Sequence, residues 1–192
     1  MSGGGRGESL AVSIALVPVG EVDPKVLEEL RQGLERVFDR QVLIGRAMAD
    51  PAYTLNRKRN QHLSTAILAA LCEHEASAMA ERTLGVVDHD LYVPELNFVF
   101  GEAGGKAAVI ALARLRQQFY ELPEDSGLFR RRVLTEAIHE LGHTFGLGHC
   151  ETRRCVMFFS NSLADTDRKG PGFCPRCRGK LHPDGTPPHR SR

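Results

Sequence analysis

The sequence predicts one α/β domain built on a mixed sheet, with a small appended subdomain, and three observations support this architecture. Apolar stretches rich in valine and isoleucine alternate with stretches of helical periodicity, giving the order strand, helix, strand, helix, three strands, helix. The chain has 192 residues, 42% of them hydrophobic, which is enough for one domain with its own core. Four of its five cysteines follow the last of these helices, which indicates a small appended subdomain.

The first half of the chain contains two expected strands and two expected helices. The run Leu10–Val19 is apolar almost throughout, as in a strand that is buried on both faces. Asp23 is a good N-cap, and Pro24 suits the first position of the helix that follows. We expect a second strand over Gln41–Met48 and a long helix over Arg57–Glu81. The buried stripe of that helix would consist of Leu63, Ile67, Leu68 and Leu71.

The second half contains three expected strands before a final helix. Thr83–Tyr92 is the first strand, and Asn97–Gly101 is expected to form a hairpin with Ala107–Leu115 around the glycine pair at 104–105. The final helix should begin at about Ser126, directly after an aspartate that suits the N-cap. Its buried stripe would consist of Phe129, Val133, Leu134, Ala137, Ile138 and Leu141.

Charge and hydropathy exclude several classes of partner. Lys plus Arg number 25 and Asp plus Glu number 24, so we expect neither nucleic acid nor an anionic membrane as a partner. A local basic cluster is interpreted as solvated surface; it consists of Arg168, Lys169, Arg176, Arg178 and Lys180. No run approaches the ~18 apolar residues that cross a bilayer, and residues 1–8 lack the pattern of a secretory signal. We therefore expect a cytoplasmic protein.

The same patterns give an expected division of the chain. Residues 10–149 would form the main part with the sheet and its helices, and residues 150–181 a small C-terminal subdomain. The ends, residues 1–9 and 182–192, are polar or rich in glycine, proline and arginine and are expected to be flexible.

The final helix carries a candidate metal site. His139 and His143 are four residues apart, so their imidazoles project from one helix face and can share a metal ion. Gly146 can adopt the positive φ that ends a helix and turns the chain, which would bring His149 back toward the same ion. Zinc favours such nitrogen ligands, and three protein ligands leave the fourth position open, as in catalytic sites.

Glu140 is placed beside the first ligand and would act as a general base rather than as a ligand. Zinc lowers the pKa of a bound water to about 7, so the expected reaction is hydrolysis of a peptide bond by a zinc-activated water. Chance occurrence on an amphipathic helix is the plain alternative, and the additional glycine and third histidine count against it. A catalytically silent zinc-stabilised binding or regulatory protein, and a hydrolase of another small amide, remain as alternative functions.

The motif H-E-x-x-H-x-x-G-x-x-H, with Met157 eight residues after its last histidine, resembles the signature of metzincins. The continuation H-C-x-x-x-x-C-x-M, followed by C-x-x-C at 174–177, resembles the archaemetzincins, as do the segments Val86–Tyr92 and Asn97–Gly101. This resemblance implies a metzincin-like fold with the zinc-binding helix at the floor of a cleft. It also implies that Met157 packs beneath the metal and that an extended peptide or protein substrate pairs with an edge strand at Asn97–Gly101.

The late cysteines form a second candidate metal site. Cys150 and Cys155 are separated by four residues, Cys174 and Cys177 by two, and 18 residues lie between the pairs. Such spacings suit a closed structural zinc site, so we expect two zinc ions per chain, one catalytic and one structural. An iron–sulfur cluster and a thioredoxin-type pair at Cys174 and Cys177 are the alternatives, although no strand and helix are expected around that pair. Cys72, within an apolar helical stretch, is expected to be an inert buried thiol.

Other polar residues receive structural interpretations. Four histidines lack ligand spacing and are assigned to the surface or the core; they are His62, His74, His89 and His182. Asp88 and Asp90, at the end of an expected strand, are assigned a role in the loop rather than in a third metal site.

Overall fold

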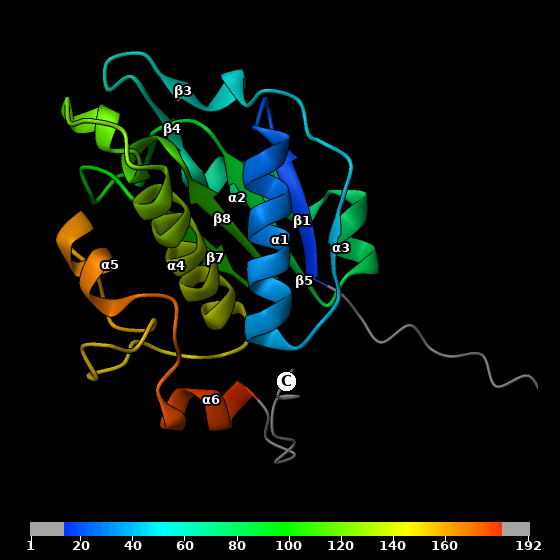
Figure 1. Ribbon diagram of the computed structural model, residues 1–192. Coiled ribbons are helices and arrows are strands. Elements are labelled where there is room, and N and C mark those ends of the chain that lie inside the picture. Colours follow the sequence, from blue (N-terminus) through cyan, green and yellow to red (C-terminus); the bar gives the residue numbers. More distant parts are fainter. Residues whose placement is uncertain (1–13, 182–192) are drawn as a thin grey trace, which may run out of the picture.

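The computed structural model describes residues 14–181 and contains a five-stranded sheet between two helical layers (Figure 1). The strand order is β2–β1–β5–β8–β7, and all neighbours are parallel except β7 and β8. The strands are β1 Ile14–Val19, β2 Val42–Ile44, β5 Arg82–Val87, β7 Gly101–Gly104 and β8 Ala107–Ala111. The predicted α/β class with a mixed sheet is confirmed. The expected flexible ends, and the part of the first expected strand before Ile14, lie outside the described residues.

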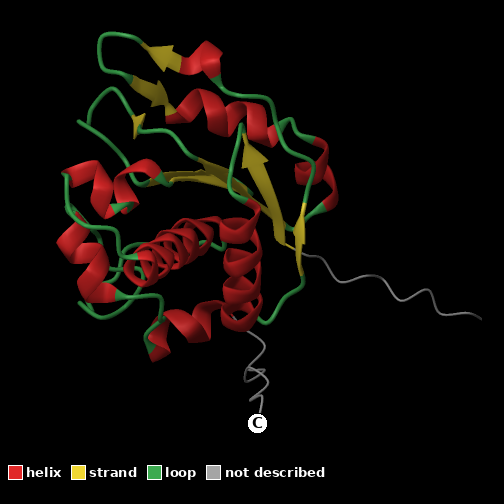
Figure 2. Ribbon diagram, turned by 45° about the horizontal axis from the view of Figure 1, so that its top comes forward, coloured by secondary structure: helices red, strands yellow, loops and turns green. Residues whose placement is uncertain are grey.

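Helices cover both faces of this sheet (Figure 2). Helices α1 (Pro24–Phe38) and α4 (Ser126–Thr144) pack on one face, while α2 (Ser64–Cys72) and α3 (Glu75–Met79) pack on the other. Alternate residues of β1 enter the two cores: Leu16 packs on the α1 and α4 side, and Val17 packs on the α2 side. A strand buried on both faces has no polar side, which explains its continuous apolar run.

Side-chain caps fix where α1 and α4 begin. The Asp23 carboxylate accepts a hydrogen bond from the backbone N–H of Lys25 at 2.8 Å, and Asp125 accepts one from Leu128 at 2.8 Å. Each cap satisfies a backbone N–H that lacks a partner within its helix. Both helix starts are therefore where the sequence predicts them, and the start of α4 sets the register of the histidines near its other end.

The predicted helix over Arg57–Glu81 is wrong in its extent, because only Ser64–Cys72 and Glu75–Met79 are helical. A short hairpin, β3 (Leu55–Asn56) and β4 (Gln61–Leu63), precedes α2 and forms a second sheet with β6 (Leu91–Tyr92) in the order β3–β4–β6. The reversal uses Asn60 in a left-handed conformation, φ 52°, which asparagine tolerates better than most residues. Because this turn contains neither glycine nor proline, Asn60 is its single weak signal in the sequence.

Other elements are shorter than predicted. The expected strand Gln41–Met48 contains only β2, and Thr83–Tyr92 divides into β5 and β6, which belong to different sheets. Cys72 is exposed rather than buried: it is the last residue of α2, and the α2 residues that pack on the sheet precede it. They are Ile67, Leu68 and Leu71.

The β7–β8 hairpin is present, but Asn97–Phe100 is not a strand. The turn contains Gly105 with φ +59°, and β7 begins only at Gly101. Before it, the chain makes a single antiparallel bridge, in which the Val99 N–H donates to the Leu91 carbonyl at 2.9 Å. We call Leu96–Phe100 the rim segment.

The C-terminal part contains two short helices, α5 (Leu163–Lys169) and α6 (Pro175–Leu181), joined by loops. Its buried residues, including Val156 and Met157, belong to the same hydrophobic core as α1 and α4. Three short 3₁₀ turns complete the described chain: η1 Ala52–Thr54, η2 Ala113–Leu115 and η3 Gln117–Tyr120. Between Ile14 and Leu181, none of the helices combines the length and apolarity that crossing a membrane requires.

Candidate metal centre and active-site cleft

Three imidazoles gather at the end of α4. His139, His143 and His149 place ring nitrogens within 4.8 Å of one another, and the Nε2 atoms of His139 and His143 are 3.1 Å apart. Zinc–nitrogen bonds of 2.0–2.1 Å in tetrahedral geometry place two ligand nitrogens about 3.3 Å apart, so the donor set fits zinc. Gly146 has φ +82°, and this left-handed residue turns the chain so that His149 returns to the helix face.

Carbonyl acceptors determine which nitrogens of the histidines face the site. His139 Nδ1 lies 2.7 Å from the Val156 carbonyl, and His143 Nδ1 lies 2.8 Å from the Leu147 carbonyl. Because a carbonyl only accepts, each Nδ1 carries the proton and each Nε2 keeps its lone pair for a metal. Burial, followed by the positive charge of Lys169, lowers the pKa of His139, which also favours the neutral ligand form.

Glu140 faces the same cleft and packs directly against β7. A Cβ atom added to Gly101 would lie 2.6 Å from Glu140 Cγ and 2.7 Å from the Val109 carbonyl oxygen, so only glycine leaves room for this carboxylate. Burial raises the pKa of Glu140 to about 8, and the nearby Glu136 carboxylate acts in the same direction. A cation at the three imidazoles would favour the ionised form that accepts a proton.

We expect Gly101→Ala to displace Glu140. The added methyl group has no space between a carboxylate side chain and a backbone carbonyl, and such overpacking typically costs about 1–3 kcal/mol. Denaturant unfolding should show this loss, and hydrolytic activity should fall because the carboxylate moves. Gly104→Ala on the same strand is the matched control, since its Cβ would meet only the flexible Leu68 side chain, at 3.3 Å. Equal stability and activity of the two variants would contradict the packing argument.

The cleft beside the histidines has a volume of about 390 Å³ and three sides. Helix α4 supplies the floor, the rim segment and Gly101 form one wall, and residues 159–161 with Lys169 form the other. Phe159 is half exposed and lies 4.8 Å from the ring centre of His149. The Ser160 hydroxyl is buried without a hydrogen-bond partner among the described residues. An apolar cleft with a few polar groups and a cluster of potential metal ligands is typical of a substrate site.

Lys169 is a cleft residue that sequence reasoning placed incorrectly on the solvated surface. Its ammonium group has no exposed side-chain area and lies 3.3 Å from Glu136 Oε1, 3.4 Å from the Phe158 carbonyl and 3.2 Å from His139 Nδ1. Thr166 donates a second hydrogen bond to Glu136 at 2.9 Å. No sequence signal distinguishes Lys169, whereas Glu136 could have been found because it precedes Glu140 by one helical turn on the same face.

The four late cysteines also lie together. Their sulfur atoms lie within 4.8 Å of one another, and Cys150 Sγ is 3.8 Å from Cys174 Sγ. Zinc–sulfur bonds of about 2.3 Å in tetrahedral geometry place two sulfurs about 3.8 Å apart, so this set also fits zinc. Helix α6 begins directly after Cys174, although the sequence predicts no helix there. A thioredoxin-type redox pair would nevertheless leave Cys150 and Cys155 without a role.

The two donor clusters are joined through one short segment. Cys150 follows His149 in sequence, and its N–H donates to the Met157 carbonyl at 2.8 Å. Val156, whose carbonyl accepts a hydrogen bond from His139 Nδ1, lies between Cys155 and Met157 in the sequence. Met157 itself is fully buried against α4, where a Cβ added to Gly142 would collide with its sulfur. The segment His149–Met157 thus supports both clusters.

The other singled-out residues lie apart from these clusters. Asp88 and Asp90 bind Arg116 and Arg114 at 2.7 and 2.6 Å, which agrees with a role in the loop. His62 is buried and stacks on His89, with ring centres 4.2 Å apart. His74 caps α3, and His182 lies outside the described residues.

Comparison with known proteins identifies the family. The model of peptidase family M54 matches residues 25–183. The archaemetzincin of Methanocaldococcus jannaschii is 42% identical over 178 residues, covering 92% of this chain and 96% of the relative. The solved archaemetzincin from Methanopyrus kandleri matches with a TM-score of 0.79 and 37% identity, covering 92% of this chain and 97% of that one. A zinc-dependent peptidase from Methanocorpusculum labreanum matches with a TM-score of 0.78 and 28% identity over 88% and 99%. The chain therefore belongs to peptidase family M54, the archaemetzincins, and is a zinc metallopeptidase.

Proposed function

We propose that the chain hydrolyses peptide bonds with Glu140 as the general base and with His139, His143 and His149 as the ligands of the catalytic zinc. When bound, the ion supplies Lewis-acid polarisation of a carbonyl and of a water molecule. Glu140 takes the proton from the attacking water and delivers it to the leaving amine. The supporting observation is that the three imidazoles, each with a ring nitrogen in the cluster, and this carboxylate share one cleft.

The four cysteines are proposed as the ligands of a second, structural zinc. Four sulfur donors leave no open position, so this ion would hold the segments before α5 and around α6 together rather than take part in chemistry. The Arg176 guanidinium lies 3.4 Å from Cys150 Sγ, where its charge would offset the negative charge of the thiolates. Two zinc ions per chain, with residues 150–181 as a metal-stabilised subdomain, follow from this proposal.

The open edge of the sheet is the proposed platform for substrate. β7 pairs with β8 on one side only, and its first residue, Gly101, lines the cleft, so an extended peptide can add to β7 by main-chain hydrogen bonds. This moves the expected platform from Asn97–Gly101 to Gly101–Gly104, because the rim segment is not a strand.

The proposal is tested by metal reconstitution and a peptide-library digest. Purified protein is stripped with a chelator, reloaded with zinc and analysed for metal content and for cleavage by mass spectrometry. We expect two zinc ions per chain in the loaded protein, cleavage only when the histidine site is filled, and slower loss of the cysteine-bound ion. The same cleavage by stripped protein would contradict metal-dependent hydrolysis.

A zinc-stabilised binding or regulatory protein on the same fold is the alternative. Its expected result is peptide binding by the zinc-loaded protein without cleavage of any library member. The presence of Glu140 beside the three imidazoles favours the peptidase, because a binding protein has no need for a buried carboxylate at that position.

A further inference from the structure

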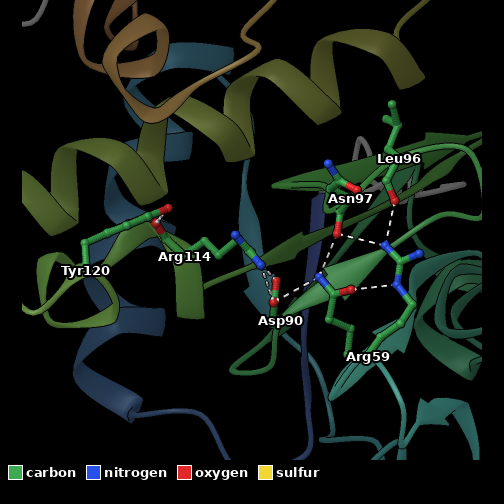
Figure 3. Close-up of polar contacts among 7 residues, drawn as sticks. Arg59, Asp90, Leu96, Asn97, Arg114 and Tyr120 are labelled. Carbon is green, nitrogen blue, oxygen red and sulfur yellow. Dashed lines mark hydrogen bonds and ion pairs between the residues drawn. The ribbon is translucent and has the colours of Figure 1, made fainter.

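Side chains from the second sheet hold the first part of the rim segment, before its single bridge at Val99. Arg59 Nη2 donates to the Leu96 carbonyl at 2.7 Å and to the Asn97 carbonyl at 2.9 Å (Figure 3). Gln61 Nε2 also donates to the Asn97 carbonyl at 2.9 Å. Two donors from the β3–β4 hairpin therefore fix the main chain of Asn97. Because the Asn97 carbonyl already accepts two hydrogen bonds, it is not available as an acceptor for a substrate.

Ion pairs extend this support to the rest of the rim. Gln61 Nε2 also contacts Asp90 Oδ2 at 3.0 Å, and Asp90 binds the Arg114 guanidinium at 2.6 and 2.8 Å (Figure 3). The same guanidinium lies over the Phe98 ring, 4.3 Å from its centre. The rim is thus a preformed wall, and ordering it costs little when a ligand binds.

The Asn97 side chain extends from this fixed main chain toward the cleft. It points away from Arg59 (Figure 3), lines the cleft opposite Lys169 and residues 159–161, and is exposed. Its carboxamide makes no hydrogen bond within residues 14–181, so both its donors and its acceptor are available to a ligand. On the other wall, the partnerless Ser160 hydroxyl is a second polar group that a bound ligand would satisfy.

We propose that Asn97 is a substrate-contacting residue whose carboxamide hydrogen-bonds a main-chain peptide group of the bound substrate, and that Arg59 and Gln61 are its positioning residues. A carboxamide matches a peptide group because each offers an N–H donor and a carbonyl acceptor. Such a contact recognises the peptide backbone and is independent of side-chain identity. The proposal rests on the proposed peptidase function, which supplies the peptide as ligand.

Binding to a slowly hydrolysing protein tests the contact separately from catalysis. The background is zinc-loaded Glu140→Gln protein, and the probe is the tightest-binding member of a library of acetylated, amidated hexapeptides, measured by calorimetry. A series of analogues replaces each backbone amide of this probe with an ester in turn. We expect the ester that replaces the amide in contact with Asn97 to weaken binding by about 2- to 12-fold, which is the value of one hydrogen bond. This loss should vanish when Asn97→Ala is added.

Three comparisons separate a contact from a structural role. Asn97→Ala keeps the carbonyl that Arg59 and Gln61 hold, so its thermal stability and zinc content should match those of the background. Arg59→Met should speed hydrogen exchange of the rim amides and lower peptide affinity. Arg57→Met in the same hairpin is the control without effect, because Arg57 is exposed and makes no polar contact within residues 14–181.

The outcomes are distinct from those that test hydrolysis. If every amide-to-ester change alters affinity by the same factor in the parent and in Asn97→Ala, the proposal is overturned even if the wild-type protein cleaves peptides. If the loss of affinity caused by the ester disappears in Asn97→Ala, the proposal is supported. This holds even if the wild-type protein binds peptides without cleaving them, a result that would refute the peptidase mechanism alone. Failure of the zinc-loaded protein to bind any library member would overturn both.

Discussion

Replacing Glu140 with glutamine is expected to lower the rate of peptide hydrolysis by about 10²- to 10⁴-fold, the usual contribution of a positioned general base. Glutamine has nearly the same size, so its contact with Gly101 is retained, but it does not accept a proton from water. Zinc content should not change, because the side chain is not a proposed ligand. Steady-state kinetics on a cleaved library peptide and metal analysis of the same sample provide the measurement.

Glu124→Gln is the matched control, because Glu124 is exposed and lies outside the cleft. The effect of Glu140→Gln should appear in kcat, since proton transfer belongs to the chemical step rather than to substrate binding. A rate within twofold of wild type would exclude Glu140 as the base. A proportional loss of zinc would instead assign the effect to the metal site.

Replacing Lys169 with methionine is expected to destabilise the protein by roughly 3–5 kcal/mol, the typical cost of leaving one member of a buried ion pair without its partner. Lys169 and Glu136 have 0% and 3% exposed side-chain area, so water does not compensate the remaining carboxylate. The midpoint of denaturant unfolding should fall accordingly. Lys106→Met in the exposed β7–β8 turn should change stability by less than about 0.5 kcal/mol.

The double variant Lys169→Met, Glu136→Gln separates pairing from packing. Glutamine keeps an oxygen that can accept from Thr166 and carries no charge, so much of the lost stability should return. If the double variant were as unstable as Lys169→Met alone, the volume of the lysine rather than the ion pair would explain the loss. Zinc affinity is a second readout, because Lys169 also lies beside His139, a proposed ligand.

The parts of the site that sequence indicates are local in the chain. His139 and His143 meet because a helix repeats every 3.6 residues, and Gly146 marks the turn by its conformational freedom. The caps Asp23 and Asp125 likewise act within three residues, so α1 and α4 begin where they are expected. The class of the fold follows from the order of such local elements.

The parts that sequence does not indicate depend on contacts between distant segments. Lys169 looks like one member of a basic run, and only the packing of α5 on α4 buries its amine beside Glu136. The rim around Asn97 was expected as a strand from its apolar residues, yet its carbonyls bind Arg59, 38 residues earlier in the chain. Periodicity does not report such partners, because it describes one segment at a time.

The segment His149–Met157 has a consequence for variation of the chain. An inserted or deleted residue there would shift either the Val156 carbonyl away from His139 or Cys155 away from the other thiols. Its length is therefore constrained from both ends, whereas exposed positions such as Arg153 and Arg154 are free to change. Loop grafting or directed evolution of this protein should accept substitutions in this stretch and reject changes in its number of residues.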